Sequence, residues 1–490
     1  PAPPVPMLVT IGDSITMGIQ DAGLKYDYQV NCYPYLIAQQ MGIASSFRQP
    51  YLVETSPGIA APPYKEPLKL ESGEIGAELW QIEFNDGDGE YDIPGPYDPE
   101  NPTVDQANAI EDYILAQLPV STLVAAGRFH NLGVSGARLF DIRTTTGAAD
   151  SEDGDNIFFD LVLQNLDTGT TRTVASQVAA MSPDYIILWI GNNDILHVVL
   201  DGAGVNGSHF IDSDTSLNPT PVSAFTAEYE AVLDAMLAVT SDLIVSTLPA
   251  YLPYAYALNG IYQTGNLIGT YQSGSTGALC LFNPGTLEPI DFGTEGSPEY
   301  LPLLMEEDTD GSNAEHLLLN GAIAYMDLEG NGYNAGVPDA TELASTYGLT
   351  AGEVTAITDA YTTLGLTPGD TTGEMTLGGN LTLTAGEVTT AGGFISDYNT
   401  AITTIAGTRS VPVVNMAAEW WSESASFGGY SGAHALQDQD TTTFSLDGVH
   451  PNNLGHALCA NAFIGAMNSA FELSIPALTV DDYAGQYTGM

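Results

Sequence analysis

The sequence predicts an α/β protein in which a parallel sheet lies between two layers of helices. Two observations lead to this prediction. Short runs of apolar residues have the length and composition of strands that are buried inside a sheet. These runs alternate along the chain with segments in which apolar residues recur at helical spacing, which is typical of a parallel sheet covered by helices on both faces.

The candidate strands and helices follow one another in a regular order. Strands are predicted at residues 7–11, near Gly127, at residues 185–194 (where the run ends in a polar turn), at residues 241–249 and at residues 411–415. Helices are predicted at residues 33–41, 171–181, 222–239 and 453–473. In such a sheet ligands bind at the carboxyl ends of the strands, so polar residues that follow the strands are candidates for a site.

A nucleophile, a base and an acid occur near the two ends of the chain. Ser14 ends the sequence Gly-Asp-Ser directly after the first strand, so its hydroxyl is expected at the carboxyl edge of the sheet. His450, in Asp-Gly-Val-His-Pro at residues 447–451, is the candidate base that takes the proton of this hydroxyl. Asp447 precedes His450 by three positions, so on a tight turn it can accept from Nδ1–H and leave Nε2 free for the serine.

Two further segments supply candidate donors for the oxyanion that forms when a hydroxyl attacks a carbonyl. Gly133 lies in Asn-Leu-Gly-Val-Ser-Gly-Ala, residues 131–137, where a bare glycine N–H can approach the reacting centre. Asn193 lies in Gly-Asn-Asn-Asp, residues 191–194, and can present its side-chain amide at the end of a buried strand.

In this order, the four segments resemble the sequence blocks of the SGNH, or GDSL-type, hydrolases. The resemblance is greatest to the large secreted GDSL lipases and esterases of bacteria. Ile15 stands where the family name has leucine, a departure that bears only on packing. The resemblance implies that the catalytic residues are Ser14, Asp447 and His450. It also implies an oxyanion hole, whose donors are Gly133, Asn193 and the N–H of Ser14.

The same resemblance implies a fold and a mechanism. The fold is the flavodoxin-like three-layer α/β/α SGNH fold, in agreement with the alternation of strands and helices. The activity is that of a serine ester hydrolase, a carboxylesterase or lipase-like acylhydrolase that forms an acyl-enzyme on a small-molecule or lipid ester. This mechanism needs neither a metal ion nor an organic cofactor. Asp13, beside the nucleophile, and His197, three residues beyond Asp194, are candidates for substrate binding.

Two other functions stay open. A carbohydrate O-acetylesterase would use the same chemistry, and Trp80, Trp420 and Trp421 can supply a face on which a sugar stacks. A surface binding protein that kept the fold and lost turnover is the other alternative, and the complete set of blocks argues against it.

The chain is strongly acidic. Only 9 Lys and Arg residues face 61 Asp and Glu residues, which gives a formal net charge of −52. We therefore expect no binding to nucleic acids or to anionic lipid headgroups, because their phosphates would be repelled. We interpret the carboxylates as a solvated surface suited to a saline habitat. No apolar run approaches the length of a membrane-spanning helix, so no transmembrane segment is expected.

The first residues and the cysteines bear on where the protein works. The sequence begins with Pro-Ala-Pro-Pro-Val-Pro in place of an initiator methionine, as the processed form of an exported protein would. We therefore expect a bacterial protein that is secreted, periplasmic or on the cell surface. Cys32, Cys280 and Cys459 lack the spacing of a metal site and allow at most one intramolecular disulfide. Cys459 lies in an apolar helical pattern and is expected to be a buried thiol.

The length of the chain predicts one SGNH hydrolase domain, residues 1–490, that carries two large loop insertions. Residues 45–125 are rich in proline, glycine and acids and are expected to form loops. Residues 250–409 contain two copies of Leu-Thr-Ala-Gly-Glu-Val-Thr, at residues 349–355 and 383–389, in which threonine can cap a helix. We expect this second insertion to be helical and to act as a lid or specificity region.

We predict that salt stabilises this protein, because the excess of 61 acids over 9 bases makes charge repulsion greater in the compact state than in the expanded one. The midpoint of thermal unfolding should rise with NaCl, chiefly below a few tenths molar, since the Debye length is about 10 Å at 0.1 M. The measurement is a thermal scan at neutral pH from about 10 mM to about 2 M NaCl. A midpoint that stays flat or falls over the low-salt range contradicts the prediction.

Overall fold

The structure is a computed structural model, and it describes much of one compact unit and small parts of a second. The two compact units are residues 1–195, 220–252 and 394–490, and residues 196–219 and 253–393. The described residues are 5–60, 67, 69–71, 74–76, 117, 128–152, 156–163, 172–200, 219–249, 316–317, 351–352, 354–355, 358, 382–383, 385–416 and 442–485.

A five-stranded parallel sheet forms the centre of the first unit. Its strands are β1 (Leu8–Gly12), β6 (Asn131–Gly133), β7 (Tyr185–Trp189), β8 (Leu243–Ser246) and β11 (Val413–Val414). Their spatial order is β11-β8-β7-β1-β6, so the second strand of the sheet along the chain lies on one side of β1 and the other three lie on the opposite side. This is the strand order of flavodoxin-like folds, and the predicted fold class is confirmed.

The second strand of the sheet lies further along the chain than predicted. Gly127 is outside the described residues, and the strand comprises Asn131–Gly133, so the segment expected to follow the strand forms the strand itself. The reason is the buried Asn131 side chain, whose amide donates to Thr16 O at 2.8 Å and to Gln49 Oε1 at 3.0 Å. These bonds make a polar residue acceptable in the interior.

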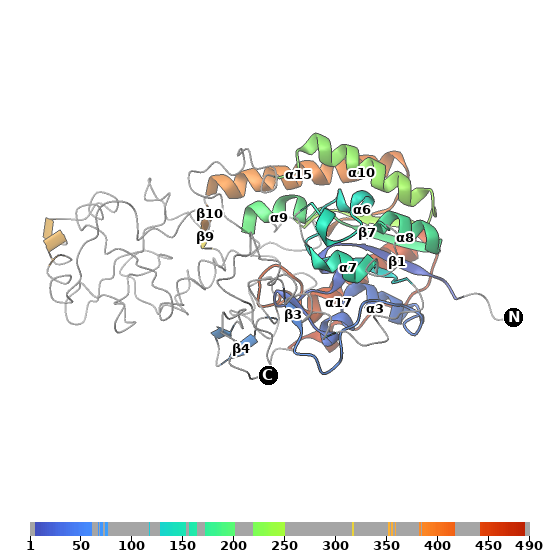
Figure 1. Cartoon of the computed structure of the whole chain (residues 1–490), viewed down its shortest axis with the longest axis horizontal. Helices are drawn as coiled ribbons and strands as arrows, with labels where there is room; N and C mark the ends of the chain where they lie inside the picture. Colours follow the sequence, from blue (N-terminus) through green and yellow to red (C-terminus); the bar gives the residue numbers. More distant parts are fainter. Residues whose placement is uncertain are drawn as a thin grey trace. The chain divides into compact units, whose positions relative to one another are not determined.

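Helices cover both faces of the sheet, as Figure 1 shows. On one side lie α3 (Tyr33–Gln40) and α17 (Asn453–Phe471), and Tyr33 stacks on Phe463 with ring centroids 5.1 Å apart, beside Trp189 of β7. On the other side lie α8 (Val174–Met181), α10 (Val222–Leu237) and the later part of α15 (Ala385–Thr408). Here Phe225 stacks on Tyr398 at 4.0 Å.

The ends of the helices differ from the predictions by a few residues, and local interactions explain two of the differences. The helix expected from residue 171 begins at Val174 because Thr173 caps it, with its hydroxyl oxygen accepting from Ser176 N. The helix expected to reach residue 473 ends at Phe471, where Glu472 adopts a left-handed conformation.

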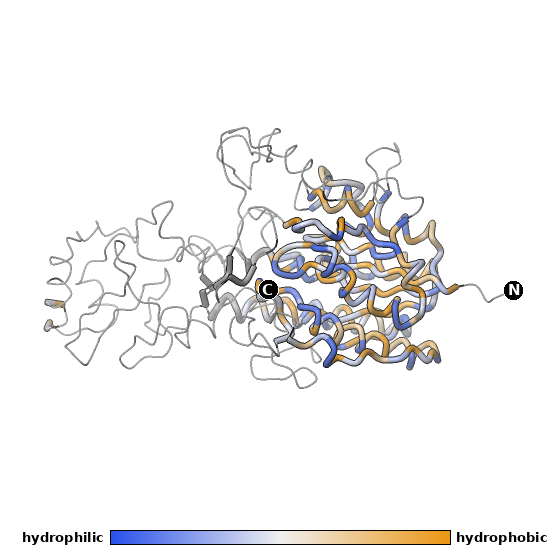
Figure 2. Tube along the Cα trace, turned by 90° about the horizontal axis from the view of Figure 1, so that it is seen from below, coloured by the Kyte–Doolittle hydropathy of each residue, from blue (hydrophilic) through white to orange (hydrophobic). Residues whose placement is uncertain are grey.

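Shorter elements complete the described part of the chain. The helices among them are α1 (Ser14–Met17), α2 (Tyr26–Gln29), α6 (Asp141–Thr144), α7 (Ile157–Leu163), α9 (Asn193–Leu200) and the 3₁₀ turns at Ala148–Asp150 and Val480–Tyr483. The strand pairs are β2 (Gly23–Leu24) with β3 (Ile59–Ala60), β4 (Lys69–Glu71) with β5 (Glu74–Gly76), and β9 (His316–Leu317) with β10 (Thr382–Leu383). Figure 2 shows apolar and polar residues alternating along the tube of the first unit, which agrees with a core enclosed by helices.

Both copies of the repeated sequence contain helical residues. In the first copy, residues 351, 352, 354 and 355 are helical, while the other residues of that copy are outside the described set. In the second copy α15 begins at Ala385, directly after the predicted cap Thr384, and continues to Thr408. The second helix is therefore much longer than the repeat. The division into one domain with two insertions stays a prediction.

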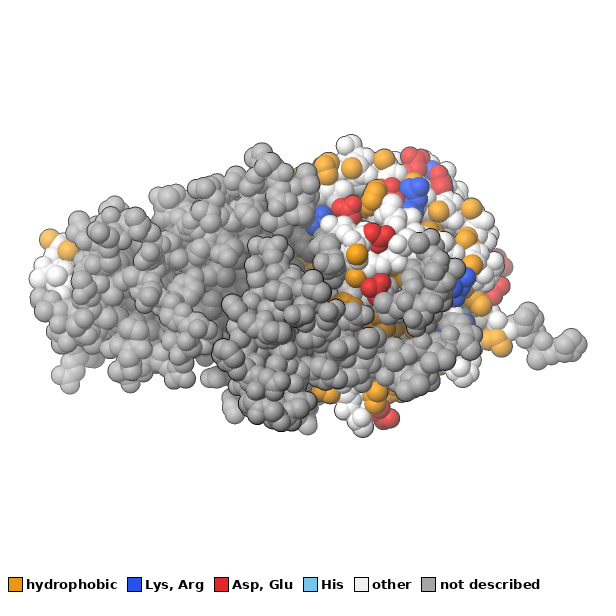
Figure 3. Space-filling model, viewed as in Figure 1, with side chains coloured by type: hydrophobic (Ala, Val, Ile, Leu, Met, Phe, Trp, Pro, Cys, Tyr) orange, Lys and Arg blue, Asp and Glu red, His pale blue; other side chains and the backbone are white. Residues whose placement is uncertain are grey.

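The described surface carries scattered charges of both signs with acids in excess, as the face in Figure 3 shows. Two of the basic side chains are paired with acids of α10. Arg143 lies 2.9 Å from Glu228, and Arg409 lies 2.7 Å from Glu230 and 2.5 Å from Asp234. Among the described residues, no helix has both the length and the apolar character that a membrane crossing requires. Cys32 and Cys459 are buried free thiols, as predicted for Cys459, and Cys280 is outside the described residues.

Two glycines allow α1 to pack directly against the ends of the strands. A Cβ on Gly12 would lie 2.4 Å from Trp189 O, and a Cβ on Gly133 would lie 2.3 Å from Met17 N. Both distances are far below van der Waals contact, and these two atoms belong to the backbone, which cannot rotate aside; a Cβ on Gly12 would also lie 2.0 Å from Thr16 Oγ1 of α1. Helix α1 can therefore occupy this position only if residues 12 and 133 have no side chain.

We predict that Gly133→Ala lowers the free energy of unfolding by about 1–3 kcal/mol or more, because the added methyl group forces the backbone of β6 and α1 apart. Gly407→Ala is the matched control, since no atom lies within 4 Å of the Cβ it would add in α15. It should be neutral or stabilise by about 0.5–1 kcal/mol. Urea unfolding of both variants tests this, and equal effects would show that α1 does not pack as described.

Candidate active site

Ser14 lies on a short turn that joins β1 to α1. Asp13 is the N-cap of this helix, and its carboxylate accepts from Ile15 N at 3.1 Å. Ser14 is therefore the first helical residue, at the carboxyl end of β1, and is almost fully buried at 5% exposure. None of the described residues accepts its backbone N–H, as expected for the first turn of a helix.

His450 and Asp447 belong to a closed loop that precedes α17. Phe444 and Pro451 form an antiparallel bridge at the base of the loop, and Ser445 N donates to His450 O at 2.9 Å. Asn452 caps α17 by accepting from Gly455 N at 3.0 Å. The loop is thus fixed at its base and held at the start of a long helix.

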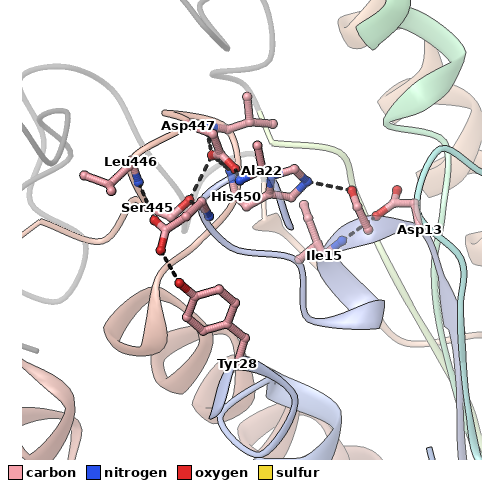
Figure 4. A network of polar contacts seen from close by, with 11 residues as sticks. Asp13, Ile15, Ala22, Tyr28, Ser445, Leu446, Asp447 and His450 are labelled. Carbon is pink, nitrogen blue, oxygen red and sulfur yellow. Dashed lines mark hydrogen bonds and ion pairs between the residues drawn. The ribbon is translucent and has the colours of Figure 1, made fainter. Parts of the chain in front are cut away.

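The structure brings the predicted nucleophile, base and acid into one hydrogen-bonded chain, and Figure 4 shows its acid end. His450 Nε2 lies 2.8 Å from Ser14 Oγ across 436 positions of sequence. His450 Nδ1 lies 2.7 Å from Asp447 Oδ2. With Nδ1–H donated to the carboxylate, Nε2 is the acceptor that faces the serine hydroxyl.

Asp447 is a buried carboxylate that several donors hold in its ionised form. Oδ1 accepts from Ser445 Oγ at 2.9 Å, Val449 N at 2.8 Å and His450 N at 2.9 Å. Oδ2 accepts from Ala22 N at 2.6 Å in addition to His450 Nδ1. Burial alone would raise the pKa of Asp447, but the His450 imidazole and the hydrogen bonds from His450 and Val449 outweigh burial and hold the pKa at about 2. The charge that orients His450 is therefore present throughout the neutral range.

Asn193 begins α9 at the carboxyl end of β7 and is held against the segment that follows β6. Its Nδ2 donates one hydrogen to Ala137 O at 2.9 Å, and the amide has a second hydrogen to offer. The next residue, Asp194, accepts from Leu139 N at 2.9 Å and from Thr220 Oγ1 at 2.7 Å. Burial, which outweighs the hydrogen bonds from Leu139 and Thr220, raises the pKa of Asp194 to about 7.

The backbone N–H of Gly133 is not free in this arrangement, which corrects the prediction that it serves as an oxyanion donor. It donates to Asn131 Oδ1 at 3.0 Å inside β6. Three residues further on, Gly136 has φ of 78°, is partly exposed, and has an N–H that no described residue accepts. The sequence signal was the second glycine of the segment, in a Ser-Gly pair typical of a turn.

The two residues predicted to bind substrate have different outcomes. Asp13 is buried, and its Oδ2 accepts from Asn192 Nδ2 at 2.7 Å while Oδ1 accepts from Ile15 N. Burial raises the pKa of Asp13 to about 6, against the lowering effects of these hydrogen bonds and of His450. His197 lies in α9, and its side chain is outside the described part of the structure. A role of either residue in substrate binding stays a prediction.

The register of the sheet explains why these residues meet. Gly12 of β1 is level with Gly133 of β6 on one side and with Trp189 of β7 on the other. The three strands therefore end side by side, at the point where the strand order reverses and where ligands bind in open α/β sheets. Among the residues that the structure describes, no three His, Cys, Asp or Glu side chains cluster as a metal site.

Comparison with known proteins gives one match. The sequence profile of the family described as GDSL-like Lipase/Acylhydrolase matches residues 8–273, a range that includes Ser14 and Asn193 but ends before Asp447 and His450. No curated protein and no solved structure matches the chain.

We predict that Asp13 makes the fold less stable as the pH rises from about 4 to about 7. Its folded-state pKa of about 6 lies above the ordinary value of 3.8, so the folded protein binds this proton more tightly than the unfolded chain. Asparagine does not titrate, so the Asp13→Asn variant should not lose stability over this pH range. The difference in unfolding free energy, variant minus wild type, should therefore be larger at pH 8 than at pH 4 by on the order of 1–3 kcal/mol. The Oδ1 of Asn192 accepts from none of the described residues and can accept from the new amide.

Asp150→Asn is the control, because hydrogen bonds from Thr146 and Gly147 outweigh burial and lower the pKa of Asp150. Its effect on the pH dependence should have the opposite sign. Urea unfolding at both pH values measures the differences, and a gain for Asp13→Asn that is the same at pH 4 and pH 8 would contradict the prediction.

Proposed function

Because the chain belongs to the GDSL-like lipase/acylhydrolase family, whose members hydrolyse esters, we propose that Ser14, His450 and Asp447 are its catalytic triad. The observation that carries the proposal is the chain of two hydrogen bonds, 2.8 Å from Ser14 Oγ to His450 Nε2 and 2.7 Å from His450 Nδ1 to Asp447 Oδ2. This is the geometry that a serine needs for activation by a neighbouring base.

In the first half of the reaction, Ser14 Oγ attacks the carbonyl carbon of the ester while His450 Nε2 takes the hydroxyl proton. Asp447 keeps its negative charge and stabilises the imidazolium that results. The tetrahedral intermediate then collapses, the bond to the alcohol oxygen breaks, and His450 returns the proton to the leaving alcohol. An acyl group remains bound to Ser14.

The oxyanion of the tetrahedral intermediate is stabilised by donors at the ends of three strands. We assign these donors as the N–H of Ser14 after β1, the N–H of Gly136 after β6 and the second Nδ2 hydrogen of Asn193 after β7. Support comes from the first two N–H groups, which no described residue accepts, and from the Asn193 amide, which uses one of its two hydrogens on Ala137 O. In this assignment Gly136 takes the role predicted from the sequence for Gly133.

In the second half, a water molecule occupies the position of the departed alcohol. His450 Nε2 accepts a proton from this water as the water oxygen attacks the acyl carbon. The second tetrahedral intermediate uses the same donors, and its collapse releases the carboxylic acid and returns the proton to Ser14 Oγ. The enzyme is then ready for another ester.

The substrate that we propose is a carboxylic ester with an acyl chain, as for a carboxylesterase or lipase-like acylhydrolase, and the description of the matching family supports this choice. The alternative of a carbohydrate O-acetylesterase rests on Trp80, Trp420 and Trp421, which lie outside the described residues. A panel of p-nitrophenyl esters of rising chain length, assayed beside acetylated xylan, separates the two substrate classes.

We predict that Ser14→Ala abolishes ester hydrolysis and labelling by a fluorophosphonate, because the nucleophilic oxygen is lost. Asn193→Ala should lower kcat on the order of a hundredfold, the usual cost of one oxyanion donor. Asp447→Asn should lower kcat on the order of a thousandfold or more, because an amide favours the wrong tautomer of His450. Steady-state kinetics and mapping of the labelled peptide to Ser14 are the measurements.

The unfolding midpoint of each variant is the control for misfolding. Ser14→Ala should have a midpoint near that of wild type, since it removes only a side-chain oxygen at the end of β1. If any of the three folded variants turns over substrate like the wild type, that residue has no part in the chemistry. If the wild type is active but the label maps elsewhere, Ser14 is not the nucleophile.

A further inference from the structure

A strained turn near the N-terminus contacts the acid of the proposed triad. Residues 20–23 form a two-residue hairpin turn in which Gln20 and Gly23 exchange backbone hydrogen bonds of 2.9 Å in both directions. Asp21 and Ala22 both have left-handed backbones, with φ of 53° and 60°. Such turns normally carry asparagine and glycine here, because a Cβ is unfavourable in this conformation. A left-handed alanine persists only where the surroundings compensate for its strain, and such strain gathers at functional sites.

The turn directs two backbone N–H groups at the loop that carries Asp447. Ala22 N donates to Asp447 Oδ2 at 2.6 Å, the same oxygen that accepts from His450 Nδ1. Asp21 N donates to Ser445 Oγ at 2.9 Å, and Ser445 Oγ in turn donates to Asp447 Oδ1 at 2.9 Å. Both carboxylate oxygens of Asp447 are therefore linked to the turn of residues 20–23, Oδ2 by a direct hydrogen bond and Oδ1 through the Ser445 hydroxyl.

The Asp21 side chain closes the connection from the other direction. Its Oδ1 accepts from Leu446 N at 2.8 Å, and its Oδ2 accepts from Tyr28 OH at 2.5 Å, so both oxygens act as acceptors. Burial, and after it the charge of Asp21, raises the pKa of Tyr28, so this hydroxyl stays protonated and donates. Figure 4 shows Tyr28 extending from its helix towards the loop that carries Ser445 and Leu446. Asp21 is 1% exposed and no substrate reaches it.

We propose that Asp21 is a positioning residue for catalysis: its carboxylate locks the left-handed turn of residues 20–23 onto the loop of residues 445–447 and so fixes the orientation of the Asp447 carboxylate. The inference rests on the proposed function, because it assigns Asp21 a role towards the acid of the triad. It goes beyond that function by adding a residue that lies 425 positions from Leu446, to whose N–H it is bonded.

The network also sets the electrostatic environment of His450. Asp21 is bonded to Leu446, next to Asp447, and Ser445 Oγ donates to Asp447 Oδ1, so removing the Asp21 charge and removing the Ser445 hydroxyl change the negative field at the imidazole in opposite senses. Removing Asp21 and removing Ser445 should therefore shift the acidic limb of the kcat/KM profile in opposite directions. A purely structural role of the network gives no reason for such opposite shifts.

Besides Asp21, three titratable groups interact electrostatically with His450 or Asp447. The Tyr28 phenol stays neutral because burial and Asp21 raise its pKa. Burial, and after it His450, lowers the pKa of His456 to about 3, so His456 stays neutral across the assay range. Asp13, with a pKa of about 6, titrates within that range, but it does so equally in the wild type and in variants of residues 21 and 445.

The test compares Asp21→Ala, Asp21→Asn and Ser445→Ala with wild type, using ester hydrolysis from about pH 5 to about pH 9. Asp21→Ala should lower kcat by roughly tenfold to a hundredfold with little change in KM, because a displaced catalytic group costs about this much. Asp21→Asn keeps an acceptor for Leu446 N and should recover most of kcat. Both Asp21 variants should move the acidic limb to lower pH, by on the order of one unit or less, and Ser445→Ala should move it to higher pH.

Asp150→Asn is the matched control. The Asp150 side chain also holds a turn, accepting from Thr146 N and Gly147 N at 2.9 Å, but its hydrogen bonds stay within residues 146–150. This variant should keep the wild-type kcat and the wild-type acidic limb. The unfolding midpoint of every variant shows whether it is folded at the assay temperature.

The proposal is overturned if folded Asp21→Ala has a kcat within about twofold of wild type. It is also overturned if kcat falls while the acidic limb stays in place in all three variants, since the network would then only support the fold. If Asp21→Ala does not fold, the limb shift of Asp21→Asn decides. Failure of the proposed function looks different: either the wild type hydrolyses no ester, or Ser14→Ala keeps wild-type turnover.

Discussion

The hydrogen bond from His450 Nδ1 to Asp447 Oδ2 is the interaction on which the site depends. It decides which ring nitrogen faces Ser14, and it can do so only if the carboxylate stays ionised while fully buried. A buried charge of this kind is tolerable because the loop supplies donors from its own backbone and from Ser445, and the turn of residues 20–23 supplies the N–H of Ala22. The closed shape of the loop and the cap of α17 thus serve one electrostatic requirement.

Close approach of backbone segments is the second requirement, and glycine provides it. The ends of β6, β1 and β7 are level, so the turns that follow these strands compete for the same space. Gly12 and Gly133 let α1 lie directly on the strand ends, and this brings Ser14 to the point where the strand order reverses. Gly133 is therefore important for packing, even though its N–H is already donated to Asn131.

Most of the fold and the central residues of the site could be predicted from the sequence because their signals are local. Ser14 follows an apolar strand, and Asp447 and His450 lie on one tight turn, so each can be read from a few neighbouring residues. The sequence predicts an oxyanion donor at Gly133 because sequence alone does not show which glycine N–H a nearby side chain has already accepted. Gly136 becomes the better candidate only when the hydrogen bonds and the positive φ are known.

Asp21 could not be found from the sequence for a different reason. Its hydrogen-bond partners in the loop of residues 445–447 lie more than 400 positions away, and Asp21 itself belongs to no sequence motif. The prediction of the second strand near Gly127 failed through a similar effect, since Asn131 is a polar residue that long-range hydrogen bonds make acceptable in a strand. Tertiary contacts outweigh local preference at both places.

The separation of 436 positions between Ser14 and His450 has a consequence for how the protein reaches its active form. During synthesis on a ribosome, β1, β6 and β7 can pair long before His450 has been added to the chain. The sheet can therefore form before the proposed site is complete. Contacts over such a separation also make folding slow, because a long loop must close before they contribute. The loop and α17 follow these strands in the sequence, so the proposed base and the helix that packs on α3 can join the fold only after the strands have been synthesised.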